Sequence, residues 1–343
     1  MQTDFEHIQS AHCENGVIVK LLRASGVDLV NEPMAFGIGS GLFYIHLPFL
    51  KLNNAPAITF RTMPGRIFKQ TCSFLDIDYA SKRFSSQRKA EAYLDQLLNR
   101  NINVGCQVGV FNLSYLPVEY RFHFNAHNIV VFGKKGDMYQ ISDTVMESPT
   151  ELSSAELLKS RFAKGLYAPK GHLYYIKNGQ STSVDKVKLK KAVVKGIKRN
   201  VRDMLYVPGS FAGVSGIRYT ANKIKTWRDG LGIRKAGRYL GHIVRMQEEI
   251  GTGGGGFRFL YAAFLQEASE LFQEPVLATA SDEFSQAGDL WRQSAVLMAG
   301  VFKGRNTEQS HFNEIAEVMY EISDIEKRAF TRLSKLKPVA GNE

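Results

Sequence analysis

Three cysteines are all that this 343-residue sequence contains, and Cys13, Cys72 and Cys106 form no paired motif. Because disulfide scaffolds rest on paired cysteines, the composition excludes one and favours a reducing cytoplasm. Long apolar runs are also missing, since no stretch approaches the ~18 residues that a membrane helix needs. Residues 1–7 carry neither a basic segment nor an apolar run, so we expect no signal peptide. These absences predict a soluble cytoplasmic protein without a membrane span.

Motifs for metals and nucleotides are scarce as well. The eight histidines include His123 and His127, but there is no paired-cysteine motif and no His-Glu-x-x-His. Residues 37–41 match only part of a dinucleotide fingerprint, because Leu42 stands where the third glycine belongs. We therefore expect no metal and no bound cofactor. Gly39 and Ser40 are predicted to form a tight turn, which serves either packing or a close approach of backbone to the substrate.

Negative charge is in short supply, since 33 Asp and Glu stand against 44 Lys and Arg, for a net charge of +11 and a pI near 9.4. This balance favours an anionic partner, such as an acidic protein, a phosphorylated group, nucleic acid or a membrane surface. Residues 186–202 hold eight Lys or Arg and no acid. On a helix, Val194, Ile197 and Val201 would share one face. The cations left facing outward are Lys191, Lys195, Lys198, Arg199 and Arg202.

These outward cations form either an ordinary solvated face or a docking site for an acidic carrier protein. Docking of that kind raises the association rate and depends on salt. Nucleic acid is less favoured, because the segment lacks stacking aromatics and a recognisable reader motif. We therefore expect no nucleic-acid partner.

Apolar periodicity divides the chain into a mixed first half and a helical second half. Helical spacing predicts helices over residues 14–24 and 87–100, and the capping box at residues 153–156 opens another. From residue 186 to residue 337 the chain is predicted to be mostly helical, with glycine-rich interruptions. We place the boundary near residue 180, which gives domains of residues 1–180 and 181–343. Apolar and aromatic runs predict strands at residues 104–110, 120–124, 129–132, 138–141 and 173–176.

A second glycine-rich segment, residues 251–256, leads into an apparent helix near Arg258. Backbone N–H groups at such a start, that of Gly254 among them, can bind an anion, and Arg258 adds positive charge. The alternative is a flexible linker between two helices.

Cys13 stands directly before a predicted amphipathic helix. The unpaired N–H groups and the positive dipole end of a helix stabilise a thiolate, and the same N–H groups can bind the oxyanion of a tetrahedral intermediate. A buried structural cysteine is the alternative interpretation. Cys72 and Cys106 receive that interpretation, because Cys106 lies within an alternating strand between valines.

Two predicted strands separated by residues 133–137 indicate a hairpin. With Phe132 opposite Met138 across a five-residue loop, the register places His127 opposite Asp143. Directly opposed Cβ atoms lie roughly 4.5–5.5 Å apart, close enough for a carboxylate to orient an imidazole. A slip of one residue would break this pair, and His127 would then be a hydrogen-bonded core histidine.

A helix-borne Cys13 and a His127–Asp143 pair together provide the groups for nucleophilic acyl chemistry. The thiolate attacks an acyl carbon, the imidazole transfers the proton, and the carboxylate fixes the tautomer. Cys13, His127 and Asp143 are therefore the candidate catalytic triad.

Two segments carry a resemblance to a known family. His12-Cys13-Glu-Asn-Gly-Val, followed by Phe36-Gly-Ile-Gly-Ser-Gly-Leu-Phe-Tyr44, resembles the amino-terminal domain of the butirosin-biosynthesis acyltransferase family. Gly251-Thr-Gly-Gly-Gly-Gly-Phe-Arg-Phe-Leu-Tyr261 resembles the uncharacterised helical domain that commonly follows it. The family resembles papain-like cysteine enzymes, including bacteriocin-processing peptidases, in which a Cys at a helix start works with a later His and an Asp or Asn.

The resemblance implies transfer of an acyl group from a carrier-protein thioester, through an acyl-cysteine, to an amine or hydroxyl. The glycine segment near Gly254 and Arg258 would then hold the phosphate of the pantetheine arm. Processing peptidases keep a Gln about six residues before the Cys, where this chain has His7 and only Gln9 nearby. Gln9 is the candidate side chain for the oxyanion, beside the backbone N–H of Cys13.

We therefore expect an α+β fold, with a papain-like catalytic domain and a mainly helical C-terminal domain that covers the acyl chain or the acceptor. The expected activity is a Cys-dependent acyltransferase in a biosynthetic pathway, with an acyl carrier protein and a small-molecule acceptor as partners. We expect no bound cofactor, because the phosphopantetheine group is carried by the substrate. Apolar C-terminal positions at helical spacing serve the core or a homodimer. Two alternatives stay open: a hydrolase with the same triad (thioesterase, peptidase or amidase), and a non-catalytic module that binds an acidic partner.

Overall fold

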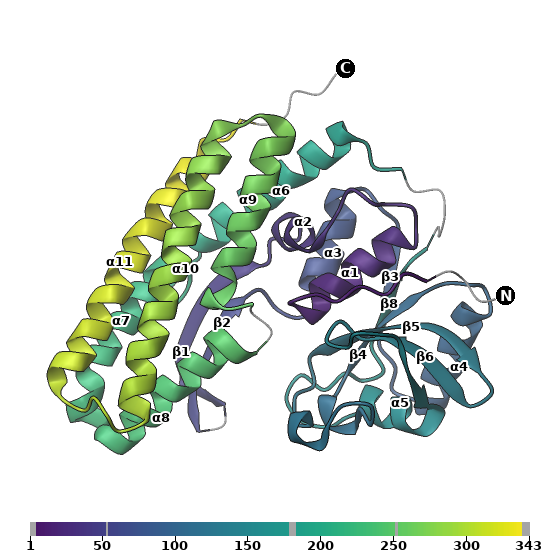
Figure 1. The fold of residues 1–343 in the computed structure, drawn as a ribbon, viewed down its shortest axis with the longest axis horizontal. Helices are drawn as coiled ribbons and strands as arrows, with labels where there is room; N and C mark the ends of the chain where they lie inside the picture. Colours follow the sequence, from purple (N-terminus) through teal and green to yellow (C-terminus); the bar gives the residue numbers. More distant parts are fainter. Residues whose placement is uncertain (1–4, 53, 178–182, 251–252, 338–343) are drawn as a thin grey trace. The chain divides into compact units, whose positions relative to one another are not determined.

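The computed structural model shows an α+β chain, as predicted, and its contacts cluster into two compact units (Figure 1). The residues that it describes are 5–52, 54–177, 183–250 and 253–337. The first unit comprises residues 1–35 and 67–188, and the second comprises residues 36–66 and 189–343.

This division differs from a single boundary near residue 180, because residues 36–66 join the C-terminal helices. The expected boundary itself, with residues 178–182, lies outside the described residues. The first crossing between the units falls inside helix α2 (Glu32–Ile38), and the chain returns at the start of helix α3 (Arg66–Phe74).

A six-stranded antiparallel sheet forms the centre of the first unit, with the strand order β3-β8-β4-β5-β6-β7. The strands are β3 (Tyr79–Lys82), β4 (Val104–Val108), β5 (His127–Lys135), β6 (Met138–Ser142), β7 (Thr150–Ser153) and β8 (Leu173–Ile176). The strands expected at residues 104–110, 129–132, 138–141 and 173–176 are therefore present, the first of them ending at Val108.

Helices cover both faces of this sheet. The ones not yet named are α1 (Cys13–Arg23), α4 (Gln87–Leu98) and α5 (Ser154–Arg161). Ile129 of β5 points into the main core, together with Leu94 of α4 and Leu157 of α5. Because side chains alternate along a strand, Asn128 and Val130 face the opposite side, where α1 packs against β5. Helices α1 and α4 match the predicted helices, and the predicted capping box does open α5.

The β5–β6 hairpin exists, but its predicted register is wrong. Its loop is two residues long rather than five, so Met138 lies opposite Lys135 and not opposite Phe132. The pairing is thus shifted by three residues from the predicted one. A bulge between Val131 and Gly133 reduces this shift by one residue, so that Val131 lies opposite Ile141. The remaining offset is two residues, an even number, so every side chain beyond the bulge keeps its predicted face.

The strand predicted at residues 120–124 is also wrong. The segment begins at the last residue of a 3₁₀ turn, Val118–Tyr120, which follows another at Val110–Asn112. The Phe124 N–H donates to the Phe122 carbonyl, and the Phe124 carbonyl accepts the Val110 N–H of the other 3₁₀ turn. The Arg121 side chain donates to the carbonyl oxygens of Ser114 and Leu116. Aromatic alternation therefore occurs here in a loop, because residues 120–124 form no ladder of backbone hydrogen bonds among the described strands.

The second unit combines a two-stranded hairpin with a set of long helices. Its elements are β1 (Leu42–Leu52), β2 (Ala55–Arg61), α6 (Lys186–Leu205), α7 (Gly213–Leu231), α8 (Ile233–Val244), a π-helical turn (Arg245–Glu249), a 3₁₀ turn (Gly255–Phe257), α9 (Arg258–Phe272), α10 (Pro275–Phe302) and α11 (Gln309–Ser334). Helices α7, α10 and α11 run side by side (Figure 1). The mainly helical character expected beyond residue 186 is confirmed.

Aromatic side chains form the centre of this helical unit. The Tyr261 and Phe284 rings lie 4.9 Å apart and meet edge to face, and Phe284 meets Phe330 at 5.0 Å. These residues come from α9, α10 and α11, whose apolar faces thus close on one another. Among the described residues, no helix is both long enough and apolar enough to cross a membrane.

Candidate functional site

Cys13 is the first residue of α1, and local capping fixes the start of that helix. His12 is the N-cap in extended conformation, and its Nδ1 accepts a hydrogen bond from the Asn15 N–H at 3.4 Å. Cys13 is partly exposed, whereas Cys72 and Cys106 are fully buried, and none of the three is in a disulfide. Burial raises the pKa of the thiols of Cys72 and Cys106, which keeps them neutral.

A carboxylate anchors the chain just ahead of this helix. Glu32, the first residue of α2, accepts the N–H of His12 at 2.7 Å and that of Ala11 at 3.0 Å. Burial raises the pKa of Glu32, and these two backbone hydrogen bonds act in the opposite direction. The position of Cys13 is therefore set from both sides, by the first turn of α1 and by α2.

Gly16 explains how the end of β6 reaches the start of α1. A Cβ at this position would lie 2.5 Å from the Ser10 Oγ and 2.5 Å from the Thr144 Cγ2, closer than atoms can pack. The absence of a side chain lets the loop after β6 lie against the first helical turn, where the Ser10 N–H donates to the Thr144 carbonyl at 3.2 Å. Asp143, the neighbour of Thr144, is thereby brought beside the helix that carries Cys13.

His127 and Asp143 are in direct contact, with His127 Nε2 2.8 Å from Asp143 Oδ2. The same Oδ2 accepts the Tyr115 hydroxyl at 2.7 Å, and Oδ1 accepts the Val145 N–H at 3.3 Å. Burial by itself would raise the pKa of the Asp143 carboxyl, but His127, Tyr115 and Val145 together hold it below its ordinary value. Asp143 is therefore an ionised, fully buried carboxylate.

The side chains of Cys13 and His127 hydrogen-bond to each other as well. Because Nε2 is used by Asp143, the ring nitrogen available to the sulfur is Nδ1. Burial disfavours the charged imidazole, but the charges of Asp143 and Cys13 and both hydrogen bonds outweigh it and raise the pKa of His127 well above its usual range. Cys13, His127 and Asp143, which are 114 and 16 residues apart in the sequence, thus converge at one end of the sheet.

Three further residues at this place were not foreseen. Tyr115 bonds Asp143, the Asn128 amide Nδ2 lies 3.8 Å from the Cys13 sulfur, and Lys20 lies buried behind the site. The Asn128 amide orientation follows from its partners, since Nδ2 donates to the Ala126 carbonyl and Oδ1 accepts the Tyr174 hydroxyl. A signal did exist for Lys20, a lone cation within the apolar run Val17–Leu22 of a predicted helix.

His7 and the oxyanion candidate Gln9, both ahead of α1, have different surroundings. His7 Nδ1 lies 2.7 Å from the Ser142 Oγ, and its Nε2 lies 2.9 Å from the Met146 carbonyl oxygen. His7, which stands where processing peptidases keep Gln, is therefore engaged with the end of β6. Gln9 is exposed on the segment before α1. Its role at the oxyanion stays a prediction.

Gly39 and Ser40 belong to the second unit, whereas Cys13 belongs to the first. The Ser40 hydroxyl donates to the Gly196 carbonyl at 3.1 Å, and Ser40 takes a left-handed φ of 52°. A Cβ on Gly196 would lie 2.5 Å from the Gly37 carbonyl oxygen, so this turn packs directly against α6. Of the two roles expected for the turn, packing is the one that these contacts support.

Arg258 does not face an anion from outside the protein. Its Nε and Nη2 bond both carboxylate oxygens of Glu326 at 2.8 and 2.9 Å, and its Nη1 bonds the Gly256 carbonyl at 2.7 Å, all fully buried. The expectation that Arg258 adds charge to an open anion site is thus corrected, because its charge neutralises an internal carboxylate. Residues 251–252 lie outside the described residues.

The glycine segment next to Arg258 also meets a protein carboxylate. The Gly255 N–H donates to the Glu248 carboxylate, with both oxygens within 3.2 Å. A Cβ on Gly254 would lie 2.8 Å from the Arg292 Nη2. Gly254 therefore stands between two charged side chains of its own unit, and a pantetheine phosphate at this segment stays a prediction.

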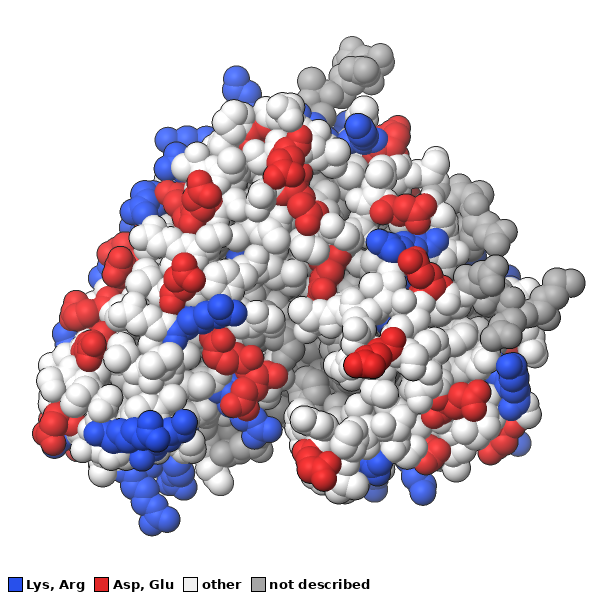
Figure 2. All heavy atoms as spheres, viewed as in Figure 1, with Lys and Arg blue, Asp and Glu red and all other residues white. Residues whose placement is uncertain are grey.

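The basic residues of α6 lie where the sequence predicted. Val194, Ile197 and Val201 are buried. The exposed cations are Lys191, Lys195, Lys198 and Arg202, while Arg199 is half-buried and pairs with Asp203 at 2.9 Å. On the face drawn in Figure 2, basic and acidic side chains are interspersed. Docking of an acidic partner on α6 stays a prediction.

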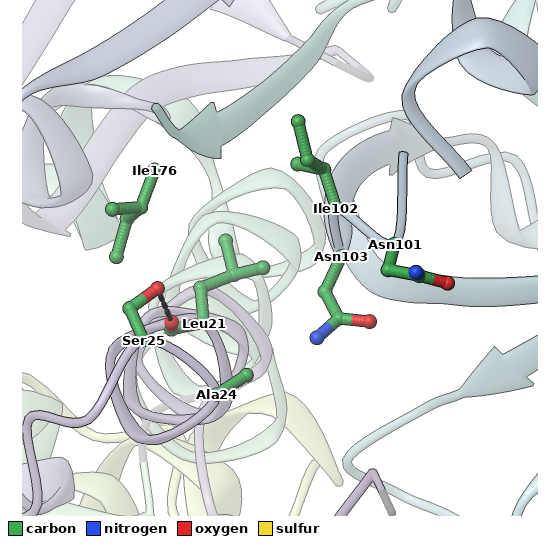
Figure 3. A pocket seen from close by; sticks show the side chains of 7 residues that line it. All are labelled: Leu21, Ala24, Ser25, Asn101, Ile102, Asn103 and Ile176. Carbon is green, nitrogen blue, oxygen red and sulfur yellow. Dashed lines mark hydrogen bonds between the residues drawn. The ribbon is translucent and has the colours of Figure 1, made fainter. Parts of the chain in front are cut away.

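Two cavities lie away from the Cys13 site. One, of about 20 Å³, is lined by Leu21, Ala24, Ser25, Asn101, Ile102, Asn103 and Ile176 (Figure 3). It lies at the C-terminal end of α1, opposite to the end that carries Cys13, and has room for about one water molecule. The other, of about 290 Å³, belongs to the second unit and is lined by Arg228, Ile233 and Thr307. Within the described ranges, no three His, Cys, Asp or Glu converge as metal ligands do.

The first unit thus presents a cysteine at a helix start beside a buried His–Asp pair. Residues 12–144, which contain all three residues, match the family model described as Butirosin biosynthesis protein H, N-terminal. Residues 155–333 match the model described as Domain of unknown function (DUF4872). That match covers more than half of the chain, so the protein belongs to this family. No curated protein matches the chain. The first match agrees with the resemblance found in the sequence and points to a biosynthetic-pathway enzyme.

Proposed function

We propose that the protein is a cysteine-dependent acyltransferase with Cys13 as nucleophile, His127 as general base and acid, and Asp143 as the carboxylate that orients His127. The observation that carries this proposal is the convergence of the three side chains, with the 2.8 Å His127–Asp143 contact at its centre. The match to a family named for a biosynthetic protein supports it. A papain-like arrangement, with a helix-borne Cys followed by a His at the start of β5 and an Asp just after β6, is part of the same proposal.

The thiolate of Cys13 attacks the carbonyl carbon of a pantetheine thioester, and the tetrahedral intermediate collapses by breaking the C–S bond to pantetheine. The departing thiolate takes its proton from the His127 imidazolium, which leaves an acyl-cysteine. An amine or hydroxyl then attacks this acyl carbon while His127 accepts its proton, and the Cys13 thiolate leaves. The balanced result is an amide or ester and free pantetheine thiol, with no oxidant or bound cofactor.

The oxyanion of each intermediate needs hydrogen-bond donors. The Cys13 backbone N–H at the start of α1 and the Asn128 amide, 3.8 Å from the sulfur, are the proposed donors on the protein. Gln9, on the exposed segment ahead of the helix, is a further candidate. An acyl carrier protein is the proposed donor partner, and a small molecule is the proposed acceptor.

The test is the intact mass of the full chain after brief exposure to a panel of acyl-carrier thioesters. Wild type should gain the mass of the acyl group, and Cys13→Ala should not. Cys72→Ala is the matched control, because this buried thiol should leave the adduct unchanged. Wild type that neither gains mass nor consumes thioester would overturn the proposal.

The same reaction separates transfer from hydrolysis. When candidate amines are supplied, an acyltransferase yields an amide and a hydrolase yields the free acid. Consumption of thioester with free acid as the only product, whatever acceptor is present, would assign the triad to a hydrolase instead.

A further inference from the structure

Lys20 is a cation buried inside the first unit, with 2% of its surface exposed. It lies seven residues after Cys13 on α1, which is two helical turns, so the two side chains share one face of the helix. Helical side chains lean toward the N-terminus, so the long lysine chain extends back toward Cys13. A buried lysine in an apolar helix needs compensating partners.

The partners of Lys20 lead directly to the candidate triad. Its Nζ donates to the Ser142 Oγ at 2.8 Å and lies 3.5 Å from the Ser142 carbonyl oxygen. Ser142 is the neighbour of Asp143, and its Oγ also contacts His7 Nδ1 at 2.7 Å. The end of β6 therefore carries a carboxylate that faces His127 and, one residue earlier on the opposite face of the strand, a hydroxyl that holds Lys20.

The formal charges of the candidate triad alone do not balance, and Lys20 supplies the missing positive charge. A thiolate on Cys13, an imidazolium on His127 and a carboxylate on Asp143 sum to one net negative charge in a largely buried place. Burial of an uncompensated charge is strongly unfavourable. A protonated Lys20 brings the sum to zero.

We infer that Lys20 is a positioning residue for the proposed reaction: its ammonium group is the counter-cation that keeps Cys13 as thiolate and Asp143 as carboxylate. The inference rests on the proposed function. Lys20 touches no substrate and acts only through its charge and through Ser142.

The ionisable groups linked to Lys20 come from α1, from the segment ahead of it and from the ends of β5 and β6. The charges that act on it are those of Asp143 after β6 and Cys13 at the start of α1. His127 on β5 contacts Asp143, and His7 ahead of α1 contacts the same Ser142 hydroxyl as Lys20. Arg23 pairs with Glu6 at 3.1 Å at the far end of α1, so these two charges offset each other. Burial lowers the pKa of Lys20 to about 8, while the charges of Asp143 and Cys13 raise it against this effect.

This position of the lysine predicts a particular pH dependence. Below pH 8 Lys20 is protonated and supports the thiolate, and as the pH rises through about 8 this support is lost. The rate of Cys13 alkylation in wild type, divided by the rate in a variant with a neutral residue 20, should therefore be about tenfold or more near pH 6. This ratio should fall toward one above pH 9.

The experiment measures alkylation of Cys13 by iodoacetamide in the full chain, between pH 5 and pH 9.5, with the labelled peptide quantified by mass. Lys20→Met removes the charge and keeps the length, and Lys20→Gln also keeps a polar group for Ser142. Circular dichroism shows which of these two Lys20 variants keeps the wild-type fold, and the alkylation rate is compared for that variant. Lys134→Met is the matched control, since it removes a lysine that pairs with Asp95 at 2.8 Å elsewhere in the same unit.

Slow alkylation near pH 6 in the Lys20 variants, with the Lys134 variant equal to wild type, is the expected result. Wild-type rates in the Lys20 variants would overturn the role of Lys20 and leave the proposed function in place. A wild-type Cys13 that reacts no faster near pH 6 than a free thiol would instead contradict the proposed function itself, and the inference with it.

Discussion

Each unit of this protein buries a group of charged side chains, and the two groups differ in one respect. In the helical unit, Arg258 and Glu326 are fully buried and bond each other through two hydrogen bonds, with Trp291 Nε1 donating to the same carboxylate at 2.9 Å. In the first unit, His127 and Asp143 are equally close, but Cys13, which completes the group, is partly exposed.

This difference separates a fully buried ion pair from the pair that we propose to be reactive. The Arg258 and Glu326 side chains are fully buried and hydrogen-bond to each other, to the Gly256 carbonyl and to Trp291, so their charges face protein groups rather than solvent. In the first unit Cys13 is partly exposed, which is what the proposed attack of its thiolate on a substrate requires. The raised pKa of His127, next to an accessible cysteine, marks this group as a candidate functional site.

The largest expected effect is on stability, in the helical unit. Glu326→Leu leaves the Arg258 guanidinium buried without its carboxylate, and should lower the free energy of unfolding by about 3–5 kcal/mol. Urea unfolding of the full chain measures it. Glu317→Leu on the same helix is the control, because its ion pair with Lys225 is exposed and should contribute at most about 1 kcal/mol. Equal losses in both variants would contradict the distinction drawn here.

The next effect is on the rate, in the first unit. Asp143→Asn removes the charge that holds the His127 proton, so acyl transfer should fall about 10²-fold or more while the fold persists. The pKa of His127 should drop toward its ordinary range, which moves the alkaline limb of the pH–rate profile to lower pH. Asp95→Asn, which affects the Lys134 and Tyr139 contacts, should leave that limb in place. An unshifted limb in the Asp143 variant would exclude the orienting role.

The same pair makes stability depend on pH. The pKa of His127 is raised on folding, so its contribution is fully present below about pH 6.5 and is lost as the pH rises through the folded-state value. The pKa of Asp143 is lowered, so its contribution is present above about pH 4 and is lost as the pH falls through the folded-state value. Urea unfolding measured from acidic to alkaline pH should show both of these losses of stability in wild type. The double variant His127→Ala, Asp143→Ala should show neither contribution.

The smallest effect concerns the exposed cations of α6. Reversing the charge of Lys191, Lys195 and Lys198 to Glu should lower kcat/KM for a carrier-bound thioester about tenfold at low salt, and the loss should shrink near about 0.5 M salt. A free pantetheine thioester should react unchanged. Reversal of the exposed Lys303 and Arg305 is the control. An equal loss of kcat/KM in the α6 variant and in the control variant would contradict docking of the carrier on α6.

Local patterns predicted a large part of the fold. The helices at Cys13–Arg23 and Gln87–Leu98, the capping box at Ser153 and the long C-terminal helix Gln309–Ser334 follow from periodicity and caps that act within a few residues. The wrongly predicted strand at residues 120–124 shows where such patterns fail. Alternation is a property of side chains, whereas a strand needs a partner for its backbone.

The pairing of His127 with Asp143 was predicted, but from a register that the structure does not have. A shorter loop shifted the hairpin by three residues, and the bulge at Phe132 returned one of them. The offset of two makes the pair diagonal on one face rather than directly opposite, a separation that long side chains bridge. Without the bulge the odd offset would have turned His127 and Asp143 to different faces.

The sequence by itself determined the secondary structure of most of the chain, the helix-start position of Cys13 and the faces on which His127 and Val194 lie. Only the tertiary structure decided that Arg258 pairs with Glu326, that Ser40 packs on α6, and that Lys20 binds Ser142, the neighbour of Asp143. The physical reason is range. Caps and periodicity act over a few neighbouring residues, whereas the partner of a buried charge is set by how elements far apart in the chain pack together.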